Sequence, residues 1–152
     1  MPQPTADEIV RALADERTVD ILTVGRRTGL TRATEIWTTL VEGVVYVCGT
    51  PAAEPQRVER EPRDWLANLR ANPSFTLRLR HPIVAEVPAR AVEVTDADER
   101  RRLFTAPQSG YYREFSRSVD DFVAHAPVVR VEFADPELTA ALAASRANGP
   151  VH

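Results

Sequence analysis

The chain of 152 residues has a formal net charge of -3, with 43% hydrophobic and 27% charged residues. This length is enough for one domain with a buried core, and the charge excludes a general affinity for nucleic acid. There is no lysine, which excludes Schiff-base chemistry, and the single Cys48 excludes an intramolecular disulfide and a multi-cysteine metal site. No apolar run approaches the roughly 20 residues that span a membrane, and no signal-peptide pattern is present. We therefore expect a cytoplasmic protein.

The first part of the chain predicts a helix and three strands. Thr5 and Glu8 have the spacing of a capping box, which favours a short helix over residues 6–15. Residues 19–24 are rich in β-branched side chains, and residues 31–41 are semi-polar on both faces. Glu42-Gly43 is a hairpin turn into a third strand over 44–49. Together these segments predict an antiparallel meander.

A tight turn, Gly25-Arg26-Arg27-Thr28-Gly29, joins the first two strands. The glycines permit positive φ at little steric cost, and Arg32 follows just beyond the turn. Guanidinium groups grip phosphate and carboxylate groups in bidentate fashion. Two interpretations are open here, an anion-binding mouth and a solvated hairpin tip.

The remaining elements follow a long, proline-rich loop over 50–63, which is either functional or a surface insertion. A helix ending at Asn72-Pro73 precedes an alternating strand over 75–80 and more β structure over 83–94. Asp96 caps a helix over 97–104, and residues 111–125 form another helical stretch. A strand over 128–133 and a helix from Pro136 complete the chain.

These elements predict an α+β fold, a small antiparallel split β-barrel of about six strands with peripheral helices. We expect a single domain over 1–152, with an N-terminal helix over about 5–15, the barrel over about 18–134, and a C-terminal helix and tail over 136–152.

The order strand, GRRTG turn, long strand, hairpin, strand, loop and then DWLANLRANP resembles the deazaflavin-dependent nitroreductase family. The resemblance is firmest over residues 19–79. It implies a split β-barrel similar to that of pyridoxamine 5'-phosphate oxidase, and it implies binding of coenzyme F-420, a deazaflavin with a phosphate and an oligoglutamate tail. It further implies an oxidoreductase that delivers hydride to a small organic acceptor: a quinone, a nitro compound or an activated alkene.

The same resemblance implies roles for individual residues. Tyr111 and Tyr112 lie on the segment that borders the substrate pocket in that family, although an aromatic pair there also suits a core or an interface. Trp37 is a further candidate, for the cofactor site or for an interface. The residues implied to bind the cofactor are Arg26, Arg27, Thr28, Arg32, Trp37, Cys48, Gly49, Thr50, Asp64, Trp65 and Asn68.

One stretch departs from the family pattern. Where family members commonly have Ser-Lys-Gly-Gly or a glycine-rich turn, this chain has Thr50-Pro51-Ala52-Ala53, followed by acidic residues. The alternative is a split barrel that has lost the deazaflavin site and binds FMN, haem or a lipid instead, or that acts without a redox cofactor.

Four smaller expectations concern single residues, one short run and the assembly of the protein. His125 is interpreted as a helix-capping or packing residue beside the helix dipole, and Cys48 as an inert buried thiol. The run 100–102 is interpreted as a solvated arginine face. Small split barrels pair through one side of the sheet, which predicts a homodimer with Trp37 as an anchor.

Overall fold

The computed structural model describes residues 3–15, 18–49, 64–110 and 118–147. In chain order its elements are α1 (Ala6–Asp15), β1 (Thr18–Val24), β2 (Thr31–Val41), β3 (Val44–Cys48), α3 (Asp64–Ala71), β4 (Ser74–Leu79), β5 (Ala85–Glu93), α4 (Ala97–Thr105), the short 3-10 helix η1 (Pro107–Ser109), α6 (Val119–His125), β6 (Val128–Phe133) and α7 (Pro136–Ala147).

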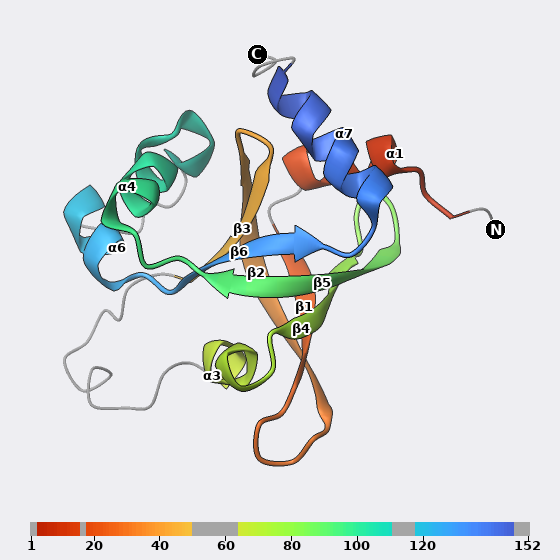
Figure 1. The fold of residues 1–152 in the computed structure, drawn as a ribbon, viewed down its shortest axis with the longest axis horizontal. Helices are drawn as coiled ribbons and strands as arrows, with labels where there is room; N and C mark the ends of the chain where they lie inside the picture. Colours follow the sequence, from red (N-terminus) through yellow and green to blue (C-terminus); the bar gives the residue numbers. More distant parts are fainter. Residues whose placement is uncertain (1–2, 16–17, 50–63, 111–117, 148–152) are drawn as a thin grey trace.

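The strands form a closed antiparallel barrel in the order β1-β2-β3-β6-β5-β4 (Figure 1). The predicted meander of the first three strands is confirmed, with Ile21 opposite Thr34 and Leu40 opposite Val45. Closure comes from β6, which lies between β3 and β5, and from β4, which returns to β1. The predicted α+β split barrel is confirmed.

Local sequence signals explain where several elements begin and turn. Thr5 and Glu8 form the predicted capping box, with each side chain accepting from the other residue's backbone N–H at 3.2 and 3.0 Å. Asp96 accepts from the N–H of Glu99 at 2.9 Å at the start of α4. Glu42 and Gly43 both have positive φ, 51° and 79°, as a two-residue hairpin with primed-turn geometry requires.

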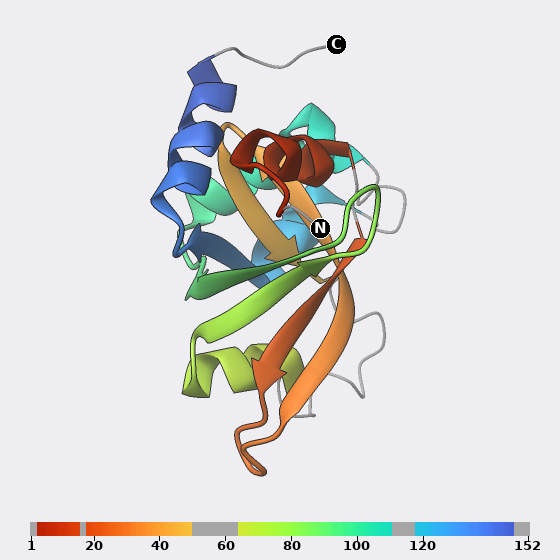
Figure 2. The ribbon, with the colours of Figure 1, turned by 90° about the vertical axis from the view of Figure 1, so that its right-hand side faces the viewer.

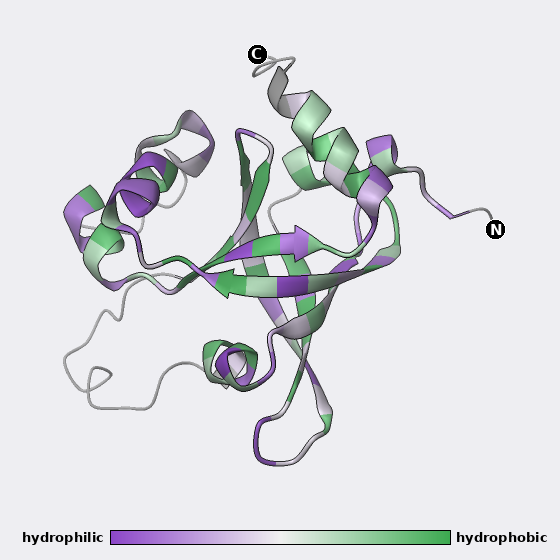
Figure 3. Ribbon diagram, in the orientation of Figure 1, coloured by the Kyte–Doolittle hydropathy of each residue, from purple (hydrophilic) through white to green (hydrophobic). Residues whose placement is uncertain are grey.

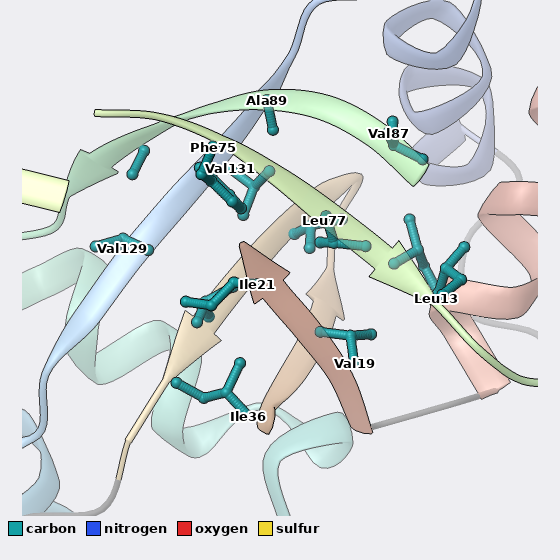
Figure 4. Packing of buried hydrophobic residues seen from close by; sticks show 14 of the residues in the cluster. Leu13, Val19, Ile21, Ile36, Phe75, Leu77, Val87, Ala89, Val129 and Val131 are labelled. Carbon is teal, nitrogen blue, oxygen red and sulfur yellow. The ribbon is translucent and has the colours of Figure 1, made fainter. Parts of the chain in front are cut away.

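The barrel interior holds the main apolar cluster (Figure 4). Strand β4 alternates as predicted, with Phe75, Leu77 and Leu79 buried and Arg78 only partly so. Helices α1 and α7 pack together at one end of the barrel (Figure 2), and they contribute Leu13 and Leu138, respectively, to the same cluster.

A second apolar cluster lies outside the barrel, between β3 and β6 on one side and α4 and α6 on the other. Phe104 and Phe122 are fully buried there, with ring centroids 5.0 Å apart. The barrel therefore has one strand face covered by helices, while α3 lies at the far end beside the β1–β2 hairpin (Figure 1). None of the described helices is long and apolar enough to cross a membrane.

Candidate functional site

The turn between β1 and β2 is held by its own backbone. The N–H of Gly25 donates to the carbonyl of Leu30 at 2.8 Å, and the N–H of Gly29 donates to the carbonyl of Gly25 at 2.8 Å. The hydroxyl oxygen of Thr28 accepts from the N–H of Leu30 at 3.2 Å. Gly29 has φ 73°, which favours glycine. The turn is thus a closed loop whose geometry does not depend on a ligand.

Gly25 is required by close approach rather than by φ. A Cβ at this position would lie 2.7 Å from the hydroxyl oxygen of Thr28 and 3.2 Å from the carbonyl of Leu30. It would also lie 3.7 Å from Cδ of Arg32, so the stem of this arginine runs alongside Gly25. A larger residue here would have to move the Thr28 side chain, which holds the turn through the N–H of Leu30, and would crowd the Leu30 carbonyl.

Asn68 fastens the turn to helix α3. Its Oδ1 accepts from the backbone N–H of Arg26 at 3.0 Å and from Nη1 of Arg26 at 3.5 Å. Its Nδ2 donates to the hydroxyl oxygen of Thr23 at 3.3 Å. Asn68 and Thr23 are 2% and 0% exposed. We call the turn 25–29 together with Arg32 and Asn68 the hairpin mouth.

The charge at the hairpin mouth is positive. Arg26 is half-buried, whereas Arg27 and Arg32 are exposed, and the tip is the hydrophilic end of the hairpin in Figure 3. Guanidinium forks on a fixed turn suit phosphate and carboxylate groups. The residues present here therefore fit the anionic part of a cofactor.

Trp37, Cys48 and Gly49 lie elsewhere on the barrel. Trp37 pairs with Cys48 across β2 and β3; Cys48 belongs to the second apolar cluster, and the partly buried Trp37 packs against it. Trp37 is about 17 Å from Arg32 along β2, at roughly 3.4 Å per residue. The N–H of Gly49 donates to the carbonyl of Pro127 at 2.9 Å, so this amide is already engaged. The expected buried position of Cys48 is confirmed.

Helix α3 carries the last described candidates. Trp65 is 5% exposed and belongs to the barrel core, so its packing holds α3 on the barrel. Asp64 begins the helix. Thr50, Tyr111 and Tyr112 lie outside the described residues, as does the loop 50–63.

A cleft of about 230 Å³ lies on the other side of α3. The helix contributes Leu66, Leu69 and Arg70, which share one face by their spacing, whereas Asn68 projects from the opposite face. Arg70 donates two hydrogen bonds to Glu93 at the rim, at 2.8 and 2.7 Å, and this lowers the pKa of the Glu93 carboxyl. Among the predicted site residues that the structure describes, none lines this cleft.

The interpretation of 100–102 as a solvated face is wrong for Arg100. Its guanidinium donates to the carbonyls of Val123 at 2.6 Å, Val94 at 2.9 Å and Phe122 at 3.3 Å, and also to that of Ala126. Burial lowers the pKa of Arg100. These carbonyls lie at the end of α6 and of β5, and no local pattern in the sequence brings them together.

A neighbouring polar cluster holds α4 on the barrel. Tyr46 donates to Glu99 at 2.9 Å, and Glu99 also accepts from Arg130 at 3.1 Å. Burial, and then the hydrogen bond to Glu99, raise the pKa of Tyr46. Tyr46 and Arg130 are register partners on β3 and β6, which could only be known once the pairing of these strands was known.

Comparison with known proteins places the chain in a family. Residues 3–132 match the family described as "F420H(2)-dependent quinone reductase". The chain belongs to this family. The deazaflavin-dependent family inferred from the GRRTG turn and the DWLANLRANP segment is confirmed. A search of curated proteins found no match.

Solved structures show the same fold at low identity. A structure titled "F420 Reductase" is 16% identical, with a TM-score of 0.59 over 89% of this chain and 97% of that one. A putative pyridoxamine 5'-phosphate oxidase from Listeria innocua is 12% identical, with a TM-score of 0.59 over 86% and 94%. A structure titled "domain-swapped dimer" is 20% identical, with a TM-score of 0.50 over 78% and 81%.

As a member of the F-420-dependent quinone reductase family, the protein is an oxidoreductase whose cofactor is coenzyme F-420. The hairpin mouth is compatible with this cofactor because its cations suit the phosphate and carboxylate groups.

Proposed function

We propose that this family member transfers hydride from reduced coenzyme F-420 to a quinone, with the anionic part of the coenzyme held at the hairpin mouth. The observation that carries the proposal is the attachment of Arg26 to α3 through Asn68. It sets a turn with two arginines in a fixed place at one end of the barrel, with Arg32 close by at the start of β2. The family description supports the choice of a quinone over a nitro compound or an activated alkene.

The residues of the chain divide the work by position. Arg26, Arg27 and Arg32 would hold phosphate and carboxylate groups by charge-assisted hydrogen bonds. Trp37 and Cys48, further along β2 and β3, are candidates to border the ring, and Tyr111 and Tyr112 remain candidates on the substrate side. The bound coenzyme supplies the hydride. The protein supplies orientation, tail binding and shielding from water.

The acceptor is tested by turnover with the three acceptor classes. The purified protein is mixed with reduced coenzyme and a soluble quinone, a nitroarene or an enone, and the return of oxidised deazaflavin absorbance is followed. We expect the largest kcat/KM with the quinone. Equal or higher kcat/KM with either of the other classes would overturn the choice of acceptor.

The cofactor assignment is tested separately by spectra and binding. A freshly purified sample is scanned for FMN, haem and deazaflavin absorbance and is then titrated with the coenzyme by ring fluorescence. We expect binding below roughly 100 micromolar, within the usual KM range. Retained FMN or haem, or no binding of the deazaflavin, would favour the alternative in which the site has changed its ligand.

We also propose that the protein is a cytoplasmic homodimer. A sequence without a predicted membrane span supports the first point, and the similar fold titled as a domain-swapped dimer supports the second. The packing of Trp37 against the second cluster gives it a role within one chain as well. Light scattering should return twice the 16.9 kDa of one chain, and a single-chain mass at all concentrations would refute the dimer.

A further inference from the structure

Asn68 has no free acceptor facing a ligand, although the resemblance placed it among the cofactor contacts. Its Oδ1 accepts twice from Arg26, at 3.0 and 3.5 Å, and its Nδ2 donates to Thr23 at 3.3 Å. An asparagine amide offers one acceptor oxygen and two N–H donors. Three of its contacts are therefore made inside the protein, and the side chain is only 2% exposed.

We propose that Asn68 is a positioning residue, which acts on coenzyme binding only through Arg26 and does not contact the coenzyme. The inference rests on the proposed function, in which the hairpin arginines hold the anionic part of the coenzyme. It assigns to Asn68 a different role from that of Arg27 and Arg32, which present exposed guanidinium groups.

The contacts explain how Asn68 would set the position of Arg26. The hydrogen bond from the backbone N–H of Arg26 to Asn68 fixes the position of the Arg26 backbone just after β1. The contact at Nη1 limits the direction in which the guanidinium group of Arg26 points. A long arginine side chain otherwise samples many rotamers, and fixing one of them before binding removes an entropic penalty. Asn68 thereby pre-organises the one arginine of the mouth that is half-buried.

A substitution at Thr23 is a second way to disturb the contact between Asn68 and Arg26. It is 0% exposed on β1 and is hydrogen-bonded to Nδ2 of Asn68, so it cannot meet a ligand at the mouth. A change of Thr23 that alters coenzyme affinity must therefore act through the protein.

The test is a double-mutant cycle on coenzyme affinity, measured by fluorescence titration. Asn68→Ala should weaken binding about three- to tenfold, the range of one or two hydrogen bonds. In the Arg26→Ala background the same change should cost almost nothing, because its only route to the coenzyme is gone.

Asn72→Ala is the matched control, because it removes the same side-chain amide four residues further along the chain. The side chain of Asn72 accepts a hydrogen bond from the N–H of Ser74, the one side-chain contact that the structure gives it among the described residues. Asn72→Ala should leave affinity unchanged.

A second readout needs no coenzyme. Hydrogen exchange of the Arg26 amide in the free protein should speed up in Asn68→Ala and stay slow in Asn72→Ala. If Asn68→Ala does not fold, Thr23→Val takes its place in the cycle. Valine keeps nearly the same shape without the hydroxyl, and the expected loss of affinity is about two- to threefold and again absent in the Arg26→Ala background.

The double-mutant cycle and the exchange measurement distinguish failure of this inference from failure of the proposed coenzyme site. Costs of Asn68→Ala and Arg26→Ala that add fully would show direct contact or an independent effect, and would overturn the inference while the proposed function stands. An Arg26→Ala variant that binds like the wild type would overturn the inference, and if Arg27→Ala also bound like the wild type, the placement of the coenzyme at the mouth would be overturned as well. Unchanged exchange at the Arg26 amide in Asn68→Ala would overturn the inference alone.

Discussion

Two groups of arginines in this protein look alike in the sequence and differ in the structure. At the hairpin mouth, Arg27 is exposed on a turn that is closed by its own backbone, and Arg32 is exposed at the start of β2. On α4, Arg100 turns inward and donates to four backbone carbonyls. A guanidinium group that is saturated by carbonyls is a structural element, whereas an exposed one on a fixed turn can meet a ligand.

The difference arises from what surrounds each side chain. The last turn of α6 has carbonyls without helical partners, and a cation near them is favoured by the helix dipole. Arg100 satisfies two of these, at Val123 and Ala126, and shares the carbonyl of Phe122 with the N–H of Ala126. It thereby joins α4 to α6 and to the end of β5.

The largest effect is expected on stability from Arg100→Ala. Four buried or half-buried carbonyls would lose a charged donor, so the free energy of unfolding should fall by about 2–4 kcal/mol. Urea unfolding measures it. Arg101→Ala is the control because Arg101 forms only an exposed ion pair with Asp120 at 2.8 Å among its described contacts, and the change should cost less than about 0.5 kcal/mol. Equal losses in the two variants would remove the distinction.

The next largest effect is expected on binding from Arg27→Ala. A charge-assisted contact contributes about 1.5–3 kcal/mol, which is roughly 10- to 150-fold in coenzyme affinity. The exposure of Arg27 favours the low end of this range. Fluorescence titration should show this loss, and Arg101→Ala should bind the coenzyme like the wild type. Equal affinities for the two variants would leave the GRRTG segment as only a turn.

Salt should affect the arginines of the hairpin mouth and Arg100 differently. The attraction at an exposed mouth is screened over about 8 Å at physiological ionic strength, so coenzyme affinity should fall several-fold between low and high salt. The contacts of Arg100 are short hydrogen bonds to neutral carbonyls, so its contribution to unfolding should hardly change. Salt-independent binding of the coenzyme would argue against an electrostatic mouth.

The smallest effect is expected from the ion pair of Arg70 and Glu93. This pair is more exposed than the contacts of Arg100, but unlike the proposed ligand contacts of the mouth arginines it is made within the protein. The pKa of Glu93 is lowered, so the pair stabilises the protein above the ordinary carboxyl value near 4.5 and loses this contribution as the pH falls through the lowered pKa. Glu93→Gln should reduce stability at pH 7 by less than about 1 kcal/mol. The difference from the wild type should vanish in unfolding measurements near pH 2. A difference that persists there would exclude charge as its origin.

Local features were predictable from the sequence, and long-range ones were not. The capping box at Thr5, the Glu42-Gly43 turn and the alternation of β4 depend on residues that are close in the chain, and all three are confirmed. The position of β6 between β3 and β5 depends on pairing across long separations, and nothing local specifies it. Arg100 was misjudged for the same reason.

The candidate site shows the same division. The arginine turn was visible in the sequence because its glycines and cations are adjacent. That Asn68 would reach across to Arg26 required the packing of α3 against β1, 42 residues away in the chain. The family resemblance pointed to Asn68 as a site residue, and the structure shows that its hydrogen-bond partners are Arg26 and Thr23.

We propose that the hairpin mouth, and not the α4–α6 side, holds the anionic part of the coenzyme. Hydrogen exchange with and without coenzyme F-420 tests it directly, because each region can be followed in one experiment. We expect slower exchange over 25–32 and in α3 on binding, with a larger change there than over 97–105 and 119–125. Protection confined to α4 and α6, with the mouth unchanged, would contradict it.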